Sequence, residues 1–128
     1  MTSLPASGRL NQKVLRVFSL VLILAGIGGF VIPPEFGLTS GAASYNVFHL
    51  LFGALGVFVA ARGERQSALF NTGFGAVDLY QAVASRAHLF PESYFRWRSA
   101  DDVLHVVIGL ALVVLGAKAL GQSGIPQG

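Results

Sequence analysis

Four long apolar runs alternate with short polar connections along the chain. They cover residues 14–32, 45–61, 67–87 and 102–120. Each run is close to the roughly 20 residues that an α-helix needs to cross a bilayer. Pro33 and Pro34 end the first run, because proline cannot continue a helix. The pattern predicts an all-α fold, a bundle of four transmembrane helices in a single integral membrane domain, with polar tails at 1–12 and 121–128.

Composition supports a membrane protein, since 53% of the residues are hydrophobic and only 12% are charged. Soluble domains have about 25% charged residues. The net charge of +3 does not indicate a nucleic-acid partner, because the basic residues lie near the ends of the apolar runs. They gather at the amino terminus and after the second run, which by the positive-inside rule places both termini in the cytoplasm. We expect the bacterial cytoplasmic (inner) membrane, with the lipid bilayer and other membrane subunits as partners.

The connection at residues 88–98 is rich in aromatic and basic side chains. Such a composition is typical of a short element in the headgroup region of a membrane. Ser99 precedes Asp102 by three positions, which is the spacing of a capping box. We therefore expect the last helix to begin here.

Two segments of the chain nearly repeat each other: "NVFHLLFG" in the second helix and "DVLHVVIG" in the fourth. The matching pairs are Asn46 with Asp102, His49 with His105, and Gly53 with Gly109. The two helices run in the same direction, so the repeat predicts a duplicated hairpin made of helices one–two and three–four, although helices one and three match poorly. Steps of three and four residues share a helical face. We therefore expect each polar residue to hydrogen-bond its histidine, and each glycine to admit a neighbouring helix.

The segments "GFVIPPEFGL", "NVFHLLFGALGVFVAAR", "ALFNTGFGAVDLYQAVA" and "DDVLHVVIGLALVVLG" together resemble the bacterial DUF4383 family of small four-helix membrane proteins. The resemblance covers about Val14 to Gly116. It implies four transmembrane helices and the two histidines at His49 and His105. The function of the family is unknown, so the resemblance implies no activity. Asp78 and Gln81 are outside the family pattern.

The two histidines allow two interpretations. Neutral imidazoles can ligate a haem iron or a chlorophyll magnesium, and His49 and His105 at equal depth would suit haem b with two histidine ligands. In the alternative, each histidine hydrogen-bonds a neighbour and keeps two helices in register. We expect no cofactor, with haem b or chlorophyll as the alternative, and no metal site.

The third helix carries a polar intramembrane face, because its four polar residues are seven, three and four positions apart. They are Asn71, Asp78, Gln81 and Ser85. An ionised Asp78 near mid-bilayer would cost roughly 2.5–3.5 kcal/mol, so it must be paired, neutral or hydrated. Gln81 is expected at the level of the histidines and Asp78 deeper. A proton pathway through Asp78 is the functional interpretation, and a neutral, hydrogen-bonded Asp78 is the structural one.

Motifs of soluble enzymes are absent from the sequence. It has no cysteine, no glycine-rich phosphate loop, no G-x-S-x-G and no HExxH. We expect a non-enzymatic accessory or scaffold subunit of a larger membrane complex. The alternatives are a tetrapyrrole-binding protein of a respiratory or photosynthetic membrane and a small proton-coupled carrier.

Overall fold

The computed structural model describes residues 6–123, which form five α-helices and a 3₁₀-helix, with no strand in that range. The elements are α1 Ala6–Val31, η1 Pro34–Phe36, α2 Ala43–Arg62, α3 Glu64–Ala87, α4 Glu92–Phe95 and α5 Ser99–Ser123. The all-α prediction is confirmed. The short α4 lies in the aromatic connection where a short element is expected.

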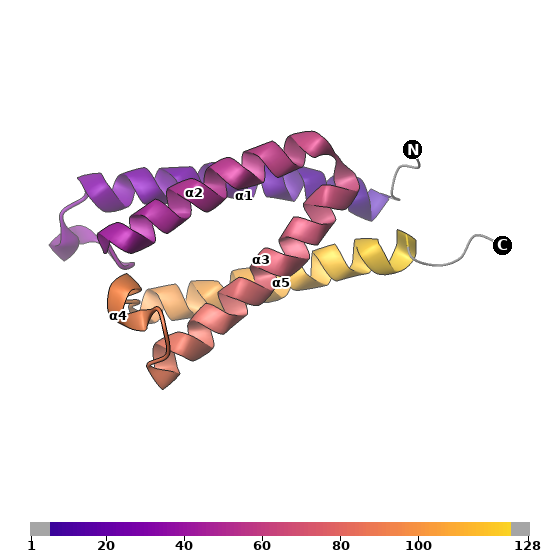
Figure 1. Cartoon of the computed structure of the whole chain (residues 1–128). Coiled ribbons are helices and arrows are strands. Elements are labelled where there is room, and N and C mark those ends of the chain that lie inside the picture. The colour runs from indigo at the N-terminus through magenta and orange to yellow at the C-terminus, as the bar shows by residue number, and fades with distance from the viewer. Residues whose placement is uncertain (1–5, 124–128) are drawn as a thin grey trace.

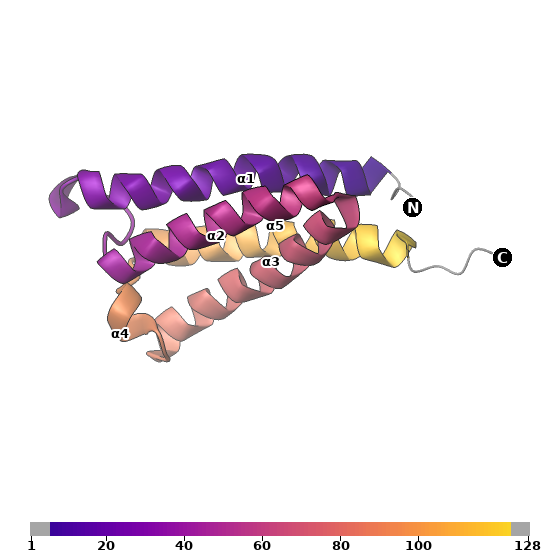
Figure 2. The same cartoon turned by 45° about the horizontal axis from the view of Figure 1, so that its top comes forward.

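The four long helices form two antiparallel hairpins (Figures 1 and 2). In one hairpin α1 packs along α2, and in the other α3 packs along α5. Gly63 joins the hairpins with a φ of 135°, a backbone conformation that residues other than glycine rarely adopt. The start of α1 and the end of α5 lie at the same end of the molecule as this turn, and α4 lies at the opposite end (Figure 1).

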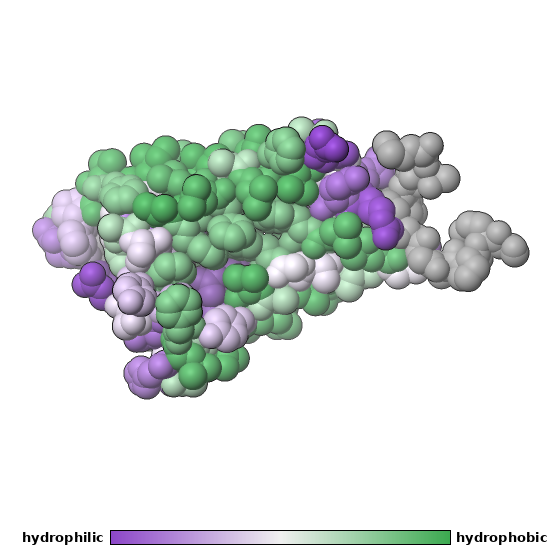
Figure 3. All heavy atoms as spheres, in the orientation of Figure 1, coloured by the Kyte–Doolittle hydropathy of each residue, from purple (hydrophilic) through white to green (hydrophobic). Residues whose placement is uncertain are grey.

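Three of the long helices are long and apolar enough to cross a membrane: Ala6–Val31, Ala43–Arg62 and Ser99–Gln122. The fourth predicted span corresponds to α3, which is too polar to be among them. Three of the four predicted spans are thus found among the candidate membrane helices. Hydrophobic residues cover the middle of the face in Figure 3, and hydrophilic residues gather toward its ends. Leu24 is 66% exposed whereas Asn11 and Asn71 are fully buried, as expected when lipid replaces water outside.

The first helix begins at Ala6, so the expectation of a polar tail is wrong for residues 6–12. The reason is a contact with α5: the Asn11 side chain donates to the carbonyl oxygens of Ser7 at 2.7 Å and Leu115 at 2.8 Å. Polar residues can continue a helix where such bonds satisfy them. At the other end, α5 continues to Ser123, and residues 124–128 lie outside the described range.

Glycines of the repeated motif bring the helices of each hairpin together, as expected. A Cβ added at Gly53 would lie 2.9 Å from the carbonyl oxygen of Ser19 on α1. A Cβ added at Gly109 would lie 2.9 Å from the carbonyl oxygen of Gly75 on α3. Gly75 follows Ser19 by 56 positions, and Gly109 follows Gly53 by 56 positions, which is the same interval that separates the two motifs. The two hairpins therefore share a packing register, while the duplication itself stays a prediction.

The amino terminus of α5 is capped by a different acid from the one the sequence suggested. Asp101 Oδ2 accepts hydrogen bonds from the backbone N–H of Arg98 and of Ser40, both at 2.8 Å. The proposed Ser99–Asp102 capping box is therefore wrong by one position. α5 begins at Ser99, which makes Asp101 the third helical residue, the position from which an acid reaches back to the cap. The same carboxylate ties the first connection to the third.

Candidate functional site

A small polar chamber lies between the hairpins, toward the α4 end, with a volume of about 110 Å³. Its polar lining comes from α2, α3, α5 and the first connection: Thr39, Tyr45, His49, Asp78, Gln81, Asp101 and His105. Phe18, Leu22, Phe48 and Phe74 are among its apolar walls. The structure therefore brings together both motif histidines and two of the four polar residues predicted on the third helix.

Tyr45 links the two histidines. Its hydroxyl forms a 2.8 Å hydrogen bond with Nε2 of His105 on the other hairpin. Its ring lies against the ring of His49, one turn further along α2, with centroids 4.1 Å apart. The Nδ1 atom of each histidine is buried without a hydrogen-bond partner among the described residues. Each histidine thus offers one unsatisfied nitrogen in a protein interior, where such groups are rare.

Asp78 lines the chamber from a deeper level than the histidines, as expected: a Cβ added at Gly109, one turn deeper than His105, would lie 3.1 Å from Cβ of Asp78. Its carboxyl group accepts a 3.0 Å hydrogen bond from Nε2 of Gln81, and both side chains are 3% exposed. The amide oxygen of Gln81 is buried without a partner in the described part of the chain. No ion pair to Asp78 occurs among residues 6–123.

The polar partners expected inside each motif are placed elsewhere. Asp102 pairs with Arg86, whose Nε lies 3.1 Å from Asp102 Oδ2, and Asn46 donates to the carbonyl oxygen of Gly41. The predicted bonds from Asp102 to His105 and from Asn46 to His49 are therefore wrong. The reason is that the connections and α3 offer better-placed partners than a residue three positions away on the same helix.

The remaining residues of the predicted polar face lie outside the chamber. Asn71 donates a 2.9 Å hydrogen bond to the side-chain oxygen of Asn11, so it joins the two hairpins nearer the termini. Ser85 is half-buried and does not line the chamber. The polar residues of α3 thus belong to two separate places, the chamber and the Asn11–Asn71 contact.

The chamber does not fit a tetrapyrrole. Sites for molecules of that kind have volumes of about 300–1,000 Å³, whereas the chamber has about 110 Å³. Tyr45 contacts both histidine rings and occupies Nε2 of His105 with its hydroxyl. Two axial histidines on one iron are not compatible with this arrangement. No group of three or more His, Asp or Glu in the described range is placed to hold a metal ion.

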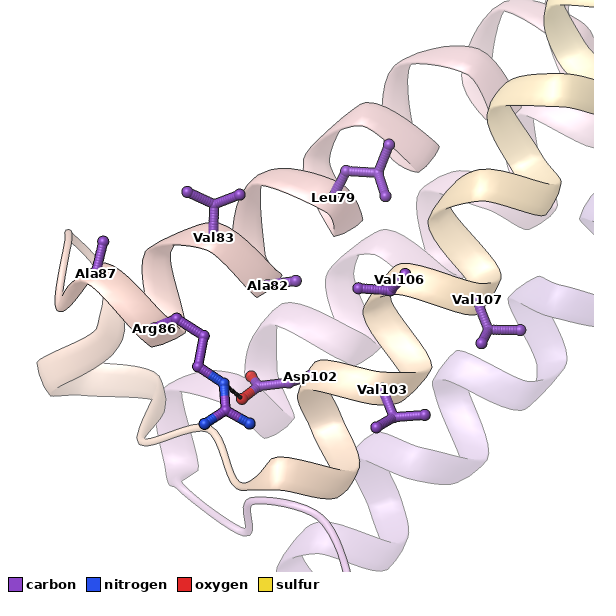
Figure 4. A pocket seen from close by; sticks show the side chains of 9 residues that line it. All are labelled: Leu79, Ala82, Val83, Arg86, Ala87, Asp102, Val103, Val106 and Val107. Atoms are coloured by element: carbon purple, nitrogen blue, oxygen red, sulfur yellow. Dashed lines mark ion pairs between the residues drawn. The ribbon is translucent and has the colours of Figure 1, made fainter.

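Two further hollows flank α3. On one side, an apolar groove of about 820 Å³ runs between α3 and α5 and ends at the Arg86–Asp102 ion pair (Figure 4). We call it the α3–α5 groove. On the other side, a hollow of about 540 Å³ lies between α2, α3 and the α4 region. We call it the aromatic hollow. Its lining includes Phe48, Tyr80, Gln81, Phe90, Tyr94 and Phe95.

The sequence reasoning missed Tyr45, Asp101 and Arg86. A signal for Tyr45 exists, since it precedes His49 by four residues and must share its helical face. Arg86 and Asp102 stand at facing ends of adjacent antiparallel helices, so their charges could have been paired. Nothing in the local pattern predicts that Asp101 reaches Ser40, because that contact depends on how the connections fold.

Comparisons of the chain with protein-family models, curated proteins and solved structures find no significant match. The resemblance to the DUF4383 family therefore stays a prediction. Function has to be argued from the geometry of this chain.

Proposed function

We propose that the chain is an integral membrane protein with four spanning helices, α3 being the fourth. The faces of α3 support this. Leu69, Val77 and Val83 are exposed to the outside, whereas Asn71 and Asp78 are buried against the other helices. With 24 residues at 1.5 Å each, α3 is about 36 Å long, enough for a hydrocarbon core of about 30 Å. A helix with this arrangement of side chains suits a bundle in lipid.

We further propose that it acts as a non-enzymatic accessory or scaffold subunit of a larger membrane complex. The aromatic hollow is the observation that carries this proposal. Phe90 and Tyr94 are 74% and 61% exposed on its rim, and aromatic side chains are enriched where proteins bind each other.

The matched test is Phe90→Ala against Phe36→Ala. Both phenylalanines belong to connections at the same end of the molecule and are 74% and 76% exposed, but only Phe90 lines the aromatic hollow. Native membranes are solubilised in a mild detergent and the size of the assembly is measured. We expect Phe90→Ala to release the chain to a smaller species and Phe36→Ala to behave as wild type. A wild-type chain that is already a monodisperse monomer would contradict the proposal.

The polar chamber favours a second candidate, a small proton-coupled carrier with Asp78 as the titrating group. A buried carboxyl group that lines the same chamber as two histidines is the kind of group that proton pathways use. Leu22, Phe74 and Leu112 form a buried apolar cluster between the chamber and the Asn11–Asn71 pair, so a carrier would have to open this cluster. Asp78→Asn in proteoliposomes tests this function. Loss of proton flux in a folded variant supports it, and unchanged flux eliminates it.

The same proposal includes the bacterial inner membrane with both termini in the cytoplasm. Basic residues support it, since Arg9, Lys13, Arg16, Arg62 and Arg65 belong to the end that holds the described helix termini and the Gly63 turn. The shared register of the hairpins supports a parallel hairpin duplication. Membership of the DUF4383 family stays part of the proposal.

A further inference from the structure

We propose that the α3–α5 groove is a binding site for one anionic phospholipid, with an acyl chain between α3 and α5 and the headgroup phosphate on Arg86. The inference rests on the insertion of α3 in the bilayer, as proposed above. It does not depend on a partner at the aromatic hollow, because that hollow lies on the opposite flank of α3.

The shape of the groove follows from the packing of its two helices. Gly75 and Gly109 hold α3 and α5 in close contact below the groove. Toward the α4 end the helices diverge, and the small side chain of Ala82 lines the space between them (Figure 4). Val83 and Val107 line it and are 59% and 60% exposed. The result is an apolar, laterally open space of about 820 Å³, within the usual size range of ligand sites.

The length of the groove favours an acyl chain over a transmembrane helix. On α3 it extends from Leu79 to Ala87, about 12 Å along the helix axis at 1.5 Å per residue. A spanning helix would need a groove that continues across most of the hydrocarbon core of about 30 Å. The groove covers about four fifths of the hydrocarbon depth of a single leaflet, so it can hold most of one lipid tail.

The polar end of the groove supplies the charge. The Arg86 side chain is 70% exposed, and its Nε is held 3.1 Å from Asp102 Oδ2, while the Asp102 side chain is only 11% exposed. In Figure 4 the two terminal nitrogens of Arg86 lie at the far end of the side chain, beyond the Nε that pairs with Asp102. Asp102 thus fixes the guanidinium and leaves its outer edge for a second anion. A guanidinium edge donates two parallel hydrogen bonds to a phosphate.

The charge requirement is tested by native mass spectrometry of the purified full chain in detergent, titrated with phosphatidylglycerol, phosphatidylcholine or oleate. We expect one phosphatidylglycerol to bind more tightly than either competitor. Arg86→Gln should weaken its binding about tenfold, which is the effect of losing charge-assisted hydrogen bonds. Arg86→Lys should recover part of it. Arg96→Gln removes a positive charge from the adjacent connection, outside the groove, and should leave binding unchanged.

The apolar wall is tested by Val107→Trp, which fills the groove from its open side. Val114→Trp is the matched control, since Val114 lies on the same helix, is 61% exposed and is outside the groove. We expect only Val107→Trp to abolish phosphatidylglycerol binding. Equal binding by Arg86→Gln and wild type, or by Val107→Trp and Val114→Trp, would overturn the inference. Tighter binding of oleate would assign the site to a free fatty acid and would also overturn it.

One further measurement separates this inference from the proposal on which it rests. A cysteine placed at Ala76, an exposed position of α3 that lines neither hollow, should resist a water-soluble maleimide if the helix lies in lipid. Protection without selective phosphatidylglycerol binding would leave the insertion of α3 standing and remove the lipid site. Rapid labelling would remove both.

Discussion

Gly75 and Gly109 face each other where α3 and α5 pack closely. A Cβ on Gly75 would lie 2.8 Å from the Gly109 carbonyl oxygen, and a Cβ on Gly109 would lie 2.9 Å from that of Gly75. Each glycine thus makes room for the backbone of the other helix. Close packing of this kind stabilises helix pairs in membranes, where lipid tails remove the hydrophobic drive to associate.

Gly75→Ala should destabilise the bundle by about 1–3 kcal/mol, the usual cost of overpacking. The added methyl group meets backbone atoms of Gly109 and Val113, which cannot move aside without separating the helices. Unfolding can be followed by the fluorescence of Trp97, the only tryptophan in the chain and 8% exposed, as SDS is added to mixed micelles.

Gly73→Ala is the control for that measurement. Gly73 lies on the same helix, two residues away, and a Cβ there has no neighbour within 4 Å. Its stability should be equal to wild type or slightly higher, because alanine favours a helix by up to about 1 kcal/mol. Equal destabilisation by the two substitutions would show that helix flexibility, and not contact between helices, explains the glycines.

The turn at Gly63 and the α4 region should lie on opposite sides of the membrane. The chain has no cysteine, so single cysteines can be introduced without removing native ones. We expect Gln66→Cys, beside the turn, to be labelled from one side of sealed vesicles and Ser93→Cys, in α4, from the other. Labelling of both from the same side would mean that α3 does not cross the bilayer, and the four-span arrangement would be wrong.

Asn11 and Asn71 should be energetically coupled across the hairpins. Asn71 Nδ2 donates to Asn11 Oδ1 at 2.9 Å, and both residues are fully buried. A double-mutant cycle with Asn11→Ala and Asn71→Ala should give a coupling of about 0.6 kcal/mol and no more than about 1.7, the range found between membrane helices. Additive effects of the two substitutions would contradict a direct bond.

The sequence predicted the long helices well, because apolar runs and prolines act locally. It also predicted the role of Gly53 and Gly109, since small residues at helical spacing have few other uses in a membrane bundle. The start of α1 was misplaced because hydropathy excludes polar residues such as Asn11, although their bonds to other helices keep them in the fold.

The site was harder to predict because its partners come from distant segments. The sequence paired His105 with Asp102 by spacing, but the fold places Tyr45, 60 positions away, at Nε2 of His105. The groove has no sequence signal at all. It arises from the divergence of α3 and α5 above Gly75, a property of backbone geometry and not of any residue in its wall.

Tyr45→Phe should destabilise the protein by about 1–3 kcal/mol, although it preserves the ring. The substitution removes only the hydroxyl that reaches His105, and Nδ1 of that imidazole already lacks a partner in the described chain, so both ring nitrogens would be left buried and unsatisfied. Tyr94→Phe is the control, because Tyr94 is 61% exposed and loses only a hydroxyl at the surface. If the two substitutions cost the same, the bond between Tyr45 and His105 does not hold the hairpins together, and the chamber must be stabilised by its apolar walls alone.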